Sequence, residues 1–465
     1  MAEPRPAQAH PPQAQSLQAE DEVIRFASDL IAMDTTNRGG GDCCERPAAE
    51  YAAARLAEVG LDPLLLEAAS GRANVVTRWE GTGSAQGALL LHGHLDVVPA
   101  NPAAWSVPPF AGEISADELW GRGAVDMKGA DAALLAVVRD WVRTGRRPAR
   151  DVVIAFTADE EDTAAYGAKW LVDEHPELFE GCTEAISESG GFTFHAAPEL
   201  RLYPIASAER GTAWLRLTAR GTAGHGSKPN GDNAVARLAE TITRIAEYRW
   251  PVRLIPTVQA AVEAISTAVG GDSAQLARLA AEGNAVALLR ELGPAGALVA
   301  GTIRNSANPT MLQAGEKVNV IPAEAVGYVD GRVLAGHEAE FSATMDQLTG
   351  PGVTWEYSHF SPALEAPLDT PLVAAMAAAL LAEDPGGIAV PYCMSGGTDA
   401  KEFSRLGMSC YGFTPLVLPA GYDYYAMFHG VNERVPLSAL RSTVRVLDRL
   451  LASLDANTGR GPASV

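Results

Sequence analysis

The first two hundred residues alternate helical hydrophobic spacing with short, continuous apolar runs. Apolar residues recur at helical spacing from Glu22 to Asp34 and again over residues 47–60, "PAAEYAAARLAEVG". Strands are then predicted at "GALLLHGHLDVV", "DVVIAFTA" and "EAISES", and helices at "KGADAALLAVVRDWVRTG" and "DTAAYGAKWLVDEHP". Continuous apolar strands between helices are typical of an α/β sheet that is covered on both faces.

The pattern changes after Ala208. Strands are predicted at "TAWLRLTARG", "AEAVGYVDGRVL" and "GVTWEYSHF", and helices at "NAVARLAETITRIAEY" and "HEAEFSATMDQL", with an Ala-rich helical stretch to about residue 298. This β, α, β, α, β set predicts a small α+β domain inserted into the first. We therefore expect one discontinuous domain of residues 22–208 and 361–455, an inserted domain of residues 209–360, and disordered tails at 1–21 and 456–465.

Composition narrows the range of partners. The chain has 465 residues, 47% of them hydrophobic, which is too long for one ordinary core. Its net charge of -21 argues against nucleic acid or an anionic membrane as a partner, because both are polyanions. That charge does not oppose a metal cation or a small substrate. No apolar run is long enough to span a bilayer.

The five cysteines include two neighbours and no CxxC pair, which supports neither a disulfide framework nor a thiolate zinc site. We interpret Cys393 and Cys410 as core residues. The first 22 residues lack the apolar core of a signal peptide. These features together predict a cytoplasmic protein.

Acidic residues and histidines follow the predicted strands. His94 lies two residues before Asp96 in "LHGHLDVVP", so both lie on one face if the strand continues. A carboxylate beside a histidine commonly orients it as a metal ligand, although a hydrogen-bonded structural histidine fits equally well. We favour the structural interpretation for His92. Glu160 and Glu188 also follow apolar runs, and ligands of α/β sheets gather at the carboxyl ends of strands.

Two further acidic positions extend this set. Adjacent carboxylates such as Glu160 and Glu161 repel each other, so they need a nearby cation or a shared proton. Asp126, in "GRGAVDMKG", precedes a predicted helix, and a helix cap or a turn is the competing interpretation. Nitrogen and oxygen donors without thiolates suit zinc, cobalt or manganese.

Eight motifs, taken in order, make a family resemblance specific. They are "HGHLDVVP", "GRGAVDMKG", "ADEE", "SESGG", "GTAGHGSKP", "VNVIP", "GGTDAKEF" and "FHGVNE". In this series the chain resembles the M20 metallopeptidase family from about residue 22 to 455. That family includes aminoacylases, carboxypeptidases of the G2 and yeast S types, succinyl-diaminopimelate desuccinylase and acetylornithine deacetylase. The resemblance implies a zinc-exopeptidase-like catalytic domain, with a mixed sheet flanked by helices, and a smaller inserted α+β domain that serves as a lid or for dimerisation.

The resemblance also implies a site with two divalent metal ions, zinc in the first place, with cobalt and manganese as alternatives. Asp126 would bridge the metals. His94 and Glu188 would complete one metal, and Glu161 and His429 the other. Asp96 would orient His94, and Glu160 would be the general base toward the water between the metals.

Other implied positions lie outside the ligand set. His225 is typical of a surface residue by itself, but the resemblance implies that it polarises the oxyanion, often from the other subunit of a homodimer. Asn319 and Arg332 resemble substrate-binding positions, and the turn at Gly396 and Gly397 resembles a loop that faces the substrate carboxylate. A surface arginine and a simple turn are the alternatives. Glu188, the third metal carboxylate, is a glutamate where several relatives of the family have aspartate. Residues 250–300 form a longer segment than in the smallest family members.

We therefore expect metal-dependent hydrolysis of an amide whose leaving group is an amino acid with a free carboxylate. A small-molecule dipeptide or N-acyl amino acid would be the substrate. A narrow biosynthetic deacylase of one metabolite and a catalytically silent metal-binding relative are the alternatives; the complete ligand set argues against the second. A serine or thiol hydrolase is disfavoured, because the chain has no GxSxG motif.

Overall fold

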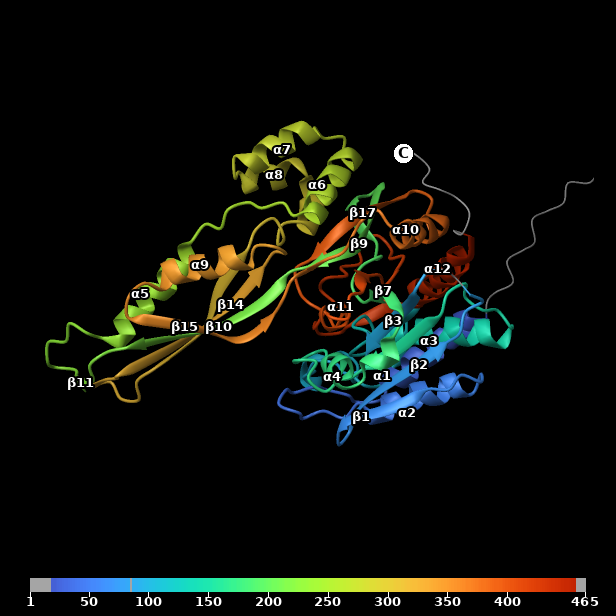
Figure 1. Ribbon diagram of the computed structural model, residues 1–465, viewed down its shortest axis with the longest axis horizontal. Helices are drawn as coiled ribbons and strands as arrows, with labels where there is room; N and C mark the ends of the chain where they lie inside the picture. The colour runs from blue at the N-terminus through green and yellow to red at the C-terminus, as the bar shows by residue number, and fades with distance from the viewer. Residues whose placement is uncertain (1–17, 84–85, 457–465) are drawn as a thin grey trace, which may run out of the picture.

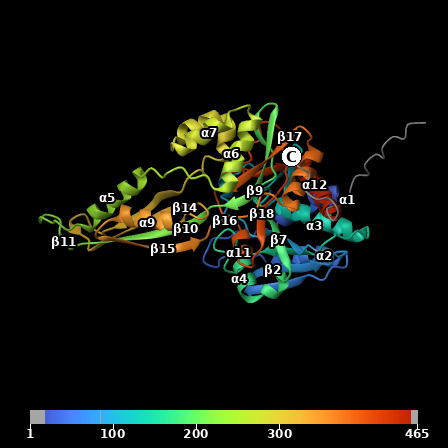
Figure 2. The same ribbon diagram turned by 45° about the horizontal axis from the view of Figure 1, so that its top comes forward.

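The computed structural model describes residues 18–83 and 86–456. The molecule is elongated: a large body surrounds one extensive sheet, and a smaller sheet projects from it (Figures 1 and 2). The tails expected to be disordered fall mostly outside the described residues, but residues 18–21 belong to the first helix, so that part of the prediction is wrong. In the described part of the chain, every helix is too short or too polar to cross a membrane.

The large sheet is mixed and has ten strands. Its order is β1 (Leu64–Ala69), β2 (Arg72–Trp79), β6 (Val152–Thr157), β3 (Ala88–His94), β7 (Cys182–Ser187), β18 (Ser409–Gly412), β9 (Leu200–Glu209) and β16 (Leu364–Glu365), and β8 (Phe194–Ala197) and β17 (Gly387–Met394) also pair with β9. Strands β6, β3, β7 and β18 run parallel. Their carboxyl ends therefore meet at one edge of the sheet, where the predicted ligands follow β3, β6 and β7.

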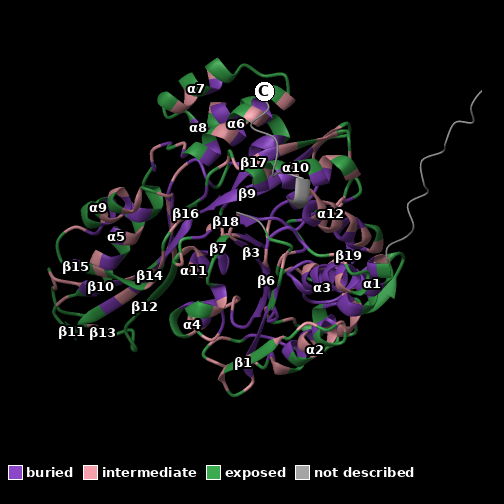
Figure 3. Cartoon of the chain, turned by 45° about the vertical axis from the view of Figure 1, so that its right-hand side comes forward, coloured by how far each residue is buried: buried purple, intermediate pink, exposed green. Residues whose placement is uncertain are grey.

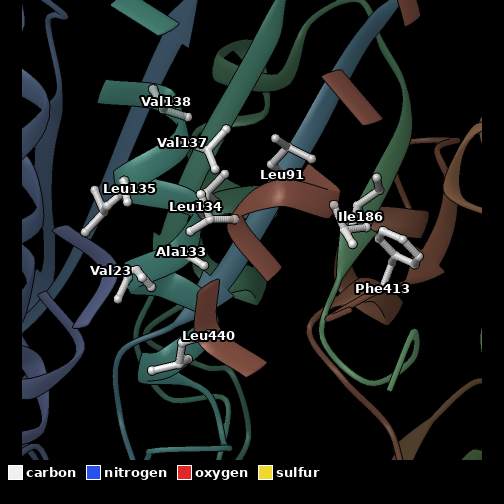
Figure 4. Packing of buried hydrophobic residues seen from close by; sticks show 14 of the residues in the cluster. Val23, Leu91, Ala133, Leu134, Leu135, Val137, Val138, Ile186, Phe413 and Leu440 are labelled. Carbon is white, nitrogen blue, oxygen red and sulfur yellow. The ribbon is translucent and has the colours of Figure 1, made fainter. Parts of the chain in front are cut away.

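Helices cover both faces of this sheet, which confirms the α/β class (Figure 3). One face packs on α1 (Gln18–Ile31), α2 (Arg46–Ala57), α3 (Lys128–Arg143), α10 (Pro371–Glu383) and α12 (Leu437–Ala456), and the other on α4 (Ala168–Glu174) and α11 (Ala400–Ser404). Alternate residues of β3 serve the two cores: Leu91 packs with α3 and α12 (Figure 4), whereas Leu90 packs toward α4 and α11. This alternation follows from the two-residue period of a strand.

The smaller sheet is antiparallel and four-stranded. Its order is β12 (Ser306–Ala314), β14 (Glu324–Val333), β10 (Gly211–Arg220) and β15 (Val353–Ser361), and α5 (Ala234–Glu247) and α9 (Glu338–Thr349) pack on it. A short ladder of β11 (Gly224–His225) with β13 (Val320–Ile321) lies at its tip. Only Arg210 separates β9 of the large sheet from β10 of the small one.

The Ala-rich stretch is helical, as expected, but its packing is unexpected. It forms α6 (Pro256–Ala268), α7 (Ser273–Ala281), α8 (Ala285–Glu291) and the 3-10 helix η3 (Gly293–Leu298). Ile265 and Leu288 share a core with Leu202 of β9 and Val390 of β17, so these helices cover the large sheet. The division of the chain at residues 209 and 360 stays a prediction.

The remaining elements are short. They are β4 (Glu113–Ser115), β5 (Glu118–Trp120), β19 (Arg434–Pro436), η1 (Pro102–Ala104) and η2 (Pro176–Phe179). Two predicted elements are longer than the observed ones. The helix expected over residues 162–176 begins only at Ala168, and β3 ends at His94, so Asp96 lies beyond the strand.

Candidate metal centre

Asp126 lies between two histidines that are far apart in the sequence. Its Oδ1 is 3.1 Å from His94 Nε2, and its Oδ2 is 3.3 Å from His429 Nε2. Met127, not Asp126, is the N-cap residue of α3, and no side chain caps that end, so the interpretation of Asp126 as a helix cap is wrong within the described residues. The two oxygens of one carboxylate thus face two separate nitrogen donors.

Each histidine has a further glutamate beside it. Glu188 Oε2 is 3.7 Å from His94 Nε2, and Glu161 Oε2 is 3.1 Å from His429 Nε2. Two ligands of one tetrahedral zinc lie about 3.3 Å apart, because each binds at about 2 Å. Among residues 18–83 and 86–456, Glu161 Oε1 is buried and meets no hydrogen-bond partner. The donor set therefore fits two divalent cations that share Asp126.

Asp96 contacts and positions several residues of the centre. The Nδ1 atom of His94 is 3.0 Å from the main-chain oxygen of Asp96 and 3.5 Å from its Oδ1, which leaves Nε2 directed at the other ligands. The Asp96 carboxylate also accepts hydrogen bonds from the backbone N–H groups of Glu160 and Glu161, both at 3.1 Å, and from Asn37. One buried carboxylate thus orients a histidine and places both adjacent glutamates.

A buried ion pair lies behind the two glutamates. Arg72 donates to both Glu45 and Asp159, with the Asp159 contact at 2.7 Å, and each of these side chains is at most 1% exposed. Asp159 directly precedes Glu160 and also accepts from Asn37 at 3.0 Å. The pair therefore fixes the start of the loop that carries Glu160.

The loop with Asp126 has its own anchor. The buried Glu433 carboxylate accepts from the backbone N–H groups of Gly123, Val125 and Asp126 and from the guanidinium of Arg122. Because a carboxylate without such donors is costly to bury, this arrangement ties the residues before α3 to the segment after His429. The late motif "FHGVNE" thus supplies both a ligand candidate and an anchor.

Three loops of the centre adopt left-handed backbone conformations at residues other than glycine. Asp159, Ser189 and His429 have φ angles of 66°, 65° and 54°. Such conformations are uncommon outside glycine, and they collect at functional sites. Each occurs at or next to a candidate ligand or base.

The pKa values of the site residues reflect the burial and the close spacing of the carboxylates. Burial, reinforced by the charge of Glu188, raises the pKa of Glu160 well above its usual value, and burial raises the pKa of Glu188 to about 7. Hydrogen bonds to Asp126 and Glu161 raise the pKa of His429 to about 10. The cluster therefore attracts positive charge strongly, either as protons or as metal cations.

Two cavities meet at Glu160. A cavity of about 250 Å³ holds the carboxylates of the cluster, and a neighbouring one of about 340 Å³ holds Arg332 and Lys401. Gly396 lines the first cavity, and Gly397 lines both. The structure thus brings the predicted arginine and glycine turn to the same place as the predicted base.

The structure does not bring His225 and Asn319 to this place within one chain. Gly226, which follows His225, donates to the Asn319 main-chain oxygen at 2.9 Å, so both residues lie in the β11–β13 region. Figures 1 and 2 show β11 at the tip of the small sheet, at the end opposite to β3 and β7.

Several residues were not anticipated from the sequence. Asn37, Arg72 and Glu433 position the centre, and an aromatic wall borders it. Their common feature is a polar side chain that is fully buried, or an aromatic ring at a loop, and neither can be recognised from local spacing. The structural interpretations of His92 and of Cys393 and Cys410 agree with their burial, and the His92 ring lies 4.7 Å from that of Phe403.

Comparison with known proteins places these features in a family. The model of Peptidase family M20/M25/M40 matches residues 90–453, which is most of the chain. The chain belongs to this family. It thus has the fold and the hydrolase class expected from its motifs.

Two distant relatives and one solved structure align over most of the chain. Aminoacylase-1A of Rattus norvegicus is 27% identical over 428 residues, covering 89% of this chain and 92% of the relative. The N-fatty-acyl-amino acid synthase/hydrolase PM20D1 of Xenopus tropicalis is 26% identical over 388 residues, covering 79% and 72%. The M20 family metallo-carboxypeptidase Sso-CP2 of Sulfolobus solfataricus has a similar fold, with a TM-score of 0.69, 16% identity and coverage of 94% and 100%.

Proposed function

We propose that the chain hydrolyses an amide bond in a metal-dependent reaction and releases an amino acid with a free carboxylate from a dipeptide or an N-acyl amino acid. The observation that carries this proposal is the position of Asp126 between His94 and His429, each with a glutamate of its own. Glu160 Oε2 lies 3.9 Å from His94 Nε2, close to the 3.7 Å of Glu188 Oε2, and the family motif assigns Glu188 as the ligand and Glu160 as the base. Membership of the M20 family supports the same reaction class.

His94, Asp126 and Glu188 would hold one metal ion, and Asp126, Glu161 and His429 the other. When bound, such ions polarise the substrate carbonyl and lower the pKa of an attacking water. We propose zinc, because nitrogen and oxygen donors at these separations suit it, with cobalt and manganese as alternatives.

Glu160 would move the proton. Its side chain lines both cavities, so it can reach the water on one side of the amide and the leaving nitrogen on the other. Burial raises its pKa, which favours a group that accepts a proton near neutral pH and then returns it. Asp96 positions Glu160 through its backbone N–H group.

Arg332 would bind the carboxylate of the leaving amino acid. Its guanidinium is held by Asp330, at 2.9 Å, and by the Thr212 hydroxyl, at 3.1 Å, so it is oriented before substrate arrives. A guanidinium can bind a carboxylate with two parallel hydrogen bonds. Gly397 lines both cavities and Gly396 lines the one with the metal cluster, so this turn would face the same carboxylate.

His225 would stabilise the oxyanion from the other subunit of a homodimer. The Ser227 N–H donates to His225 Nδ1 at 3.1 Å, which places the ring proton on Nε2, where it can be donated outward. Since β11 lies far from the cluster of its own chain, a second subunit or a large movement of the small sheet must bring His225 there. Asn319, beside it, would contact the substrate in the same way.

A cytoplasmic location stays a prediction. All five cysteines are free thiols in the structure, and no pair is bonded. A reducing compartment is consistent with that state.

The test is hydrolysis of a mixed panel of dipeptides and N-acyl amino acids by the purified protein reloaded with zinc, cobalt or manganese. We expect cleavage of free-carboxylate substrates by the parent, and a loss of at least about a hundredfold in kcat for Glu160→Gln, because general-base catalysis contributes about that much. Metal content should remain near two ions per chain in both proteins. A metal-loaded parent that cleaves no member of the panel would overturn the proposal and favour a silent binding role.

A further inference from the structure

The cavity on the metal side of Glu160 has a predominantly aromatic wall. The Phe192 ring stacks on that of Tyr424, with centroids 4.0 Å apart, and meets Tyr425 edge-on at 5.5 Å. Tyr424 in turn packs against Phe428 at 4.9 Å, and Tyr392 and Met394 complete the wall. Rings that pack on one another in this way form a rigid surface, suited to a flat or branched apolar group.

The acidic side chains that line this cavity already have a role in the proposed reaction. In the described part of the chain, the carboxylates on its wall are Asp126, Glu160, Glu161 and Glu188, all of which belong to the metal ligands or the base. The other polar side chains there are neutral hydroxyls and the imidazole of His429. A substrate ammonium placed in this cavity would find no uncommitted carboxylate, and burying a charge without a partner is costly.

The neighbouring cavity differs because cationic side chains, Lys169, Arg332 and Lys401, line it beside the carboxylates of Glu160, Asp162, Asp399 and Glu402. The Lys401 ammonium is held by the Arg210 main-chain oxygen at 2.8 Å. In the described part of the chain, no lysine or arginine lines the aromatic cavity. The carboxylate of the leaving amino acid therefore belongs in this second cavity. With Glu160 at the junction, the group on the carbonyl side of the amide must then occupy the aromatic cavity.

We infer that the enzyme prefers N-acyl amino acids with a neutral, apolar acyl group, aromatic or branched, over dipeptides with a free amino terminus. This inference rests on the proposed function, because it assumes cleavage of an amide at Glu160. It narrows the substrate to one of the two classes that the proposed function includes.

The test uses two substrates that differ in a single group. N-(3-phenylpropanoyl)-amino acid and L-phenylalanyl-amino acid share every atom of the acyl side except the α-ammonium, and both carry the leaving amino acid that the panel favours. We expect kcat/KM to be higher for the acyl substrate by on the order of tenfold or more, since only the dipeptide buries an unpaired charge. The ratio should fall as pH rises through the amino-group pKa of the dipeptide, about 8.

A gain-of-function variant provides an independent check. Tyr425, 44% exposed at the rim of the wall, can be replaced by glutamate to supply the missing partner for an ammonium. We expect Tyr425→Glu to shift the kcat/KM ratio toward the dipeptide by on the order of tenfold. Tyr248→Glu, at an exposed position beyond α5 and outside both cavities, serves as the matched control and should leave the ratio unchanged.

Binding gives a readout that does not require turnover. Calorimetric titration of metal-loaded Glu160→Gln with the two ligands should show tighter binding of the acyl compound. If the parent cleaves the two compounds equally well or prefers the dipeptide, and Glu160→Gln binds them with the same order of preference, the inference is wrong while the proposed function stands. If the metal-loaded parent cleaves neither compound nor any other member of the panel, the proposed function fails and the inference fails with it.

Discussion

At the scale of single residues, the centre depends on side chains with two tasks. Asp126 faces two histidines, and Asp96 supports both His94 and the backbone of the adjacent glutamates. The adjacent glutamates have different neighbours: Glu161 lies beside His429, whereas Glu160 lines both cavities. After burial and the charge of Glu188, the charge of Glu161 also contributes to the raised pKa of Glu160. A substitution at Asp96 should therefore affect both metal binding by His94 and the position of Glu160.

We predict that Asp96→Asn weakens metal binding by about ten- to a hundredfold, because the partner of a ligating histidine sets its orientation and basicity. The variant should also turn over more slowly when saturated with metal, as the Glu160 N–H loses a charged acceptor. Metal affinity can be measured by competition with a chromophoric chelator. Asp369→Asn, at an exposed position, is the control; equal affinities in the two variants would contradict the role of Asp96.

At the scale of elements, a salt bridge attaches the end of α10 to β9 of the large sheet. Asp384, at the end of α10, accepts from Arg201 at 2.6 and 2.7 Å and from the Tyr203 hydroxyl at 2.7 Å, both on β9. These bonds lower the pKa of Asp384 to about 2. The contact therefore stabilises the fold fully above pH 4 and loses its effect as pH falls through about 2.

We predict that Asp384→Asn lowers the free energy of unfolding at pH 7 by about 1 kcal/mol, after allowance for solvent screening. The difference between variant and parent should shrink as pH falls from 4 toward 2, because protonation of Asp384 makes the parent resemble the variant. Urea denaturation across this range measures it, with Asp369→Asn as the control. A difference that stays constant with pH would exclude the ionised pair as its source.

At the scale of the whole molecule, the β11–β13 ladder carries His225 at the far tip, away from the centre that this histidine is proposed to serve (Figure 2). Arg332, on β14 of the small sheet, lines the cavity beside Glu160. Val318 and Val320 are exposed at this tip, at 106% and 49%. A second subunit that supplies His225 would account for both observations.

We predict complementation between two inactive variants. His225→Ala should lose about a hundred- to a thousandfold in kcat with its metal content unchanged, as expected for loss of one oxyanion donor. Unfolded and refolded together with Glu160→Ala, it should recover about a quarter of parental activity, because half of randomly formed dimers are mixed and each has one complete site. No recovery in mixtures that do form dimers would place His225 in its own chain's site.

Much of the centre was predictable because the relevant information is local. His94, Glu160 and Glu188 each follow an apolar strand directly, and parallel strands align their carboxyl ends whatever the rest of the chain does. The order of the motifs then named the family and, through it, His429. The helical segment after residue 250 was also predicted as helix, but periodicity does not state which sheet a helix covers.

The sequence by itself therefore determined the class of fold, the residues at the strand ends and the acidic, thiol-free character of the site, because spacing and residue type express these directly. Tertiary structure alone decided that Phe192, Tyr392 and Tyr424 form one wall, that Glu433 anchors the loop of Asp126, and that His225 lies apart from the centre. Those relations join residues separated by tens to hundreds of positions. They depend on how the sheets and loops pack, which no local pattern of side chains specifies.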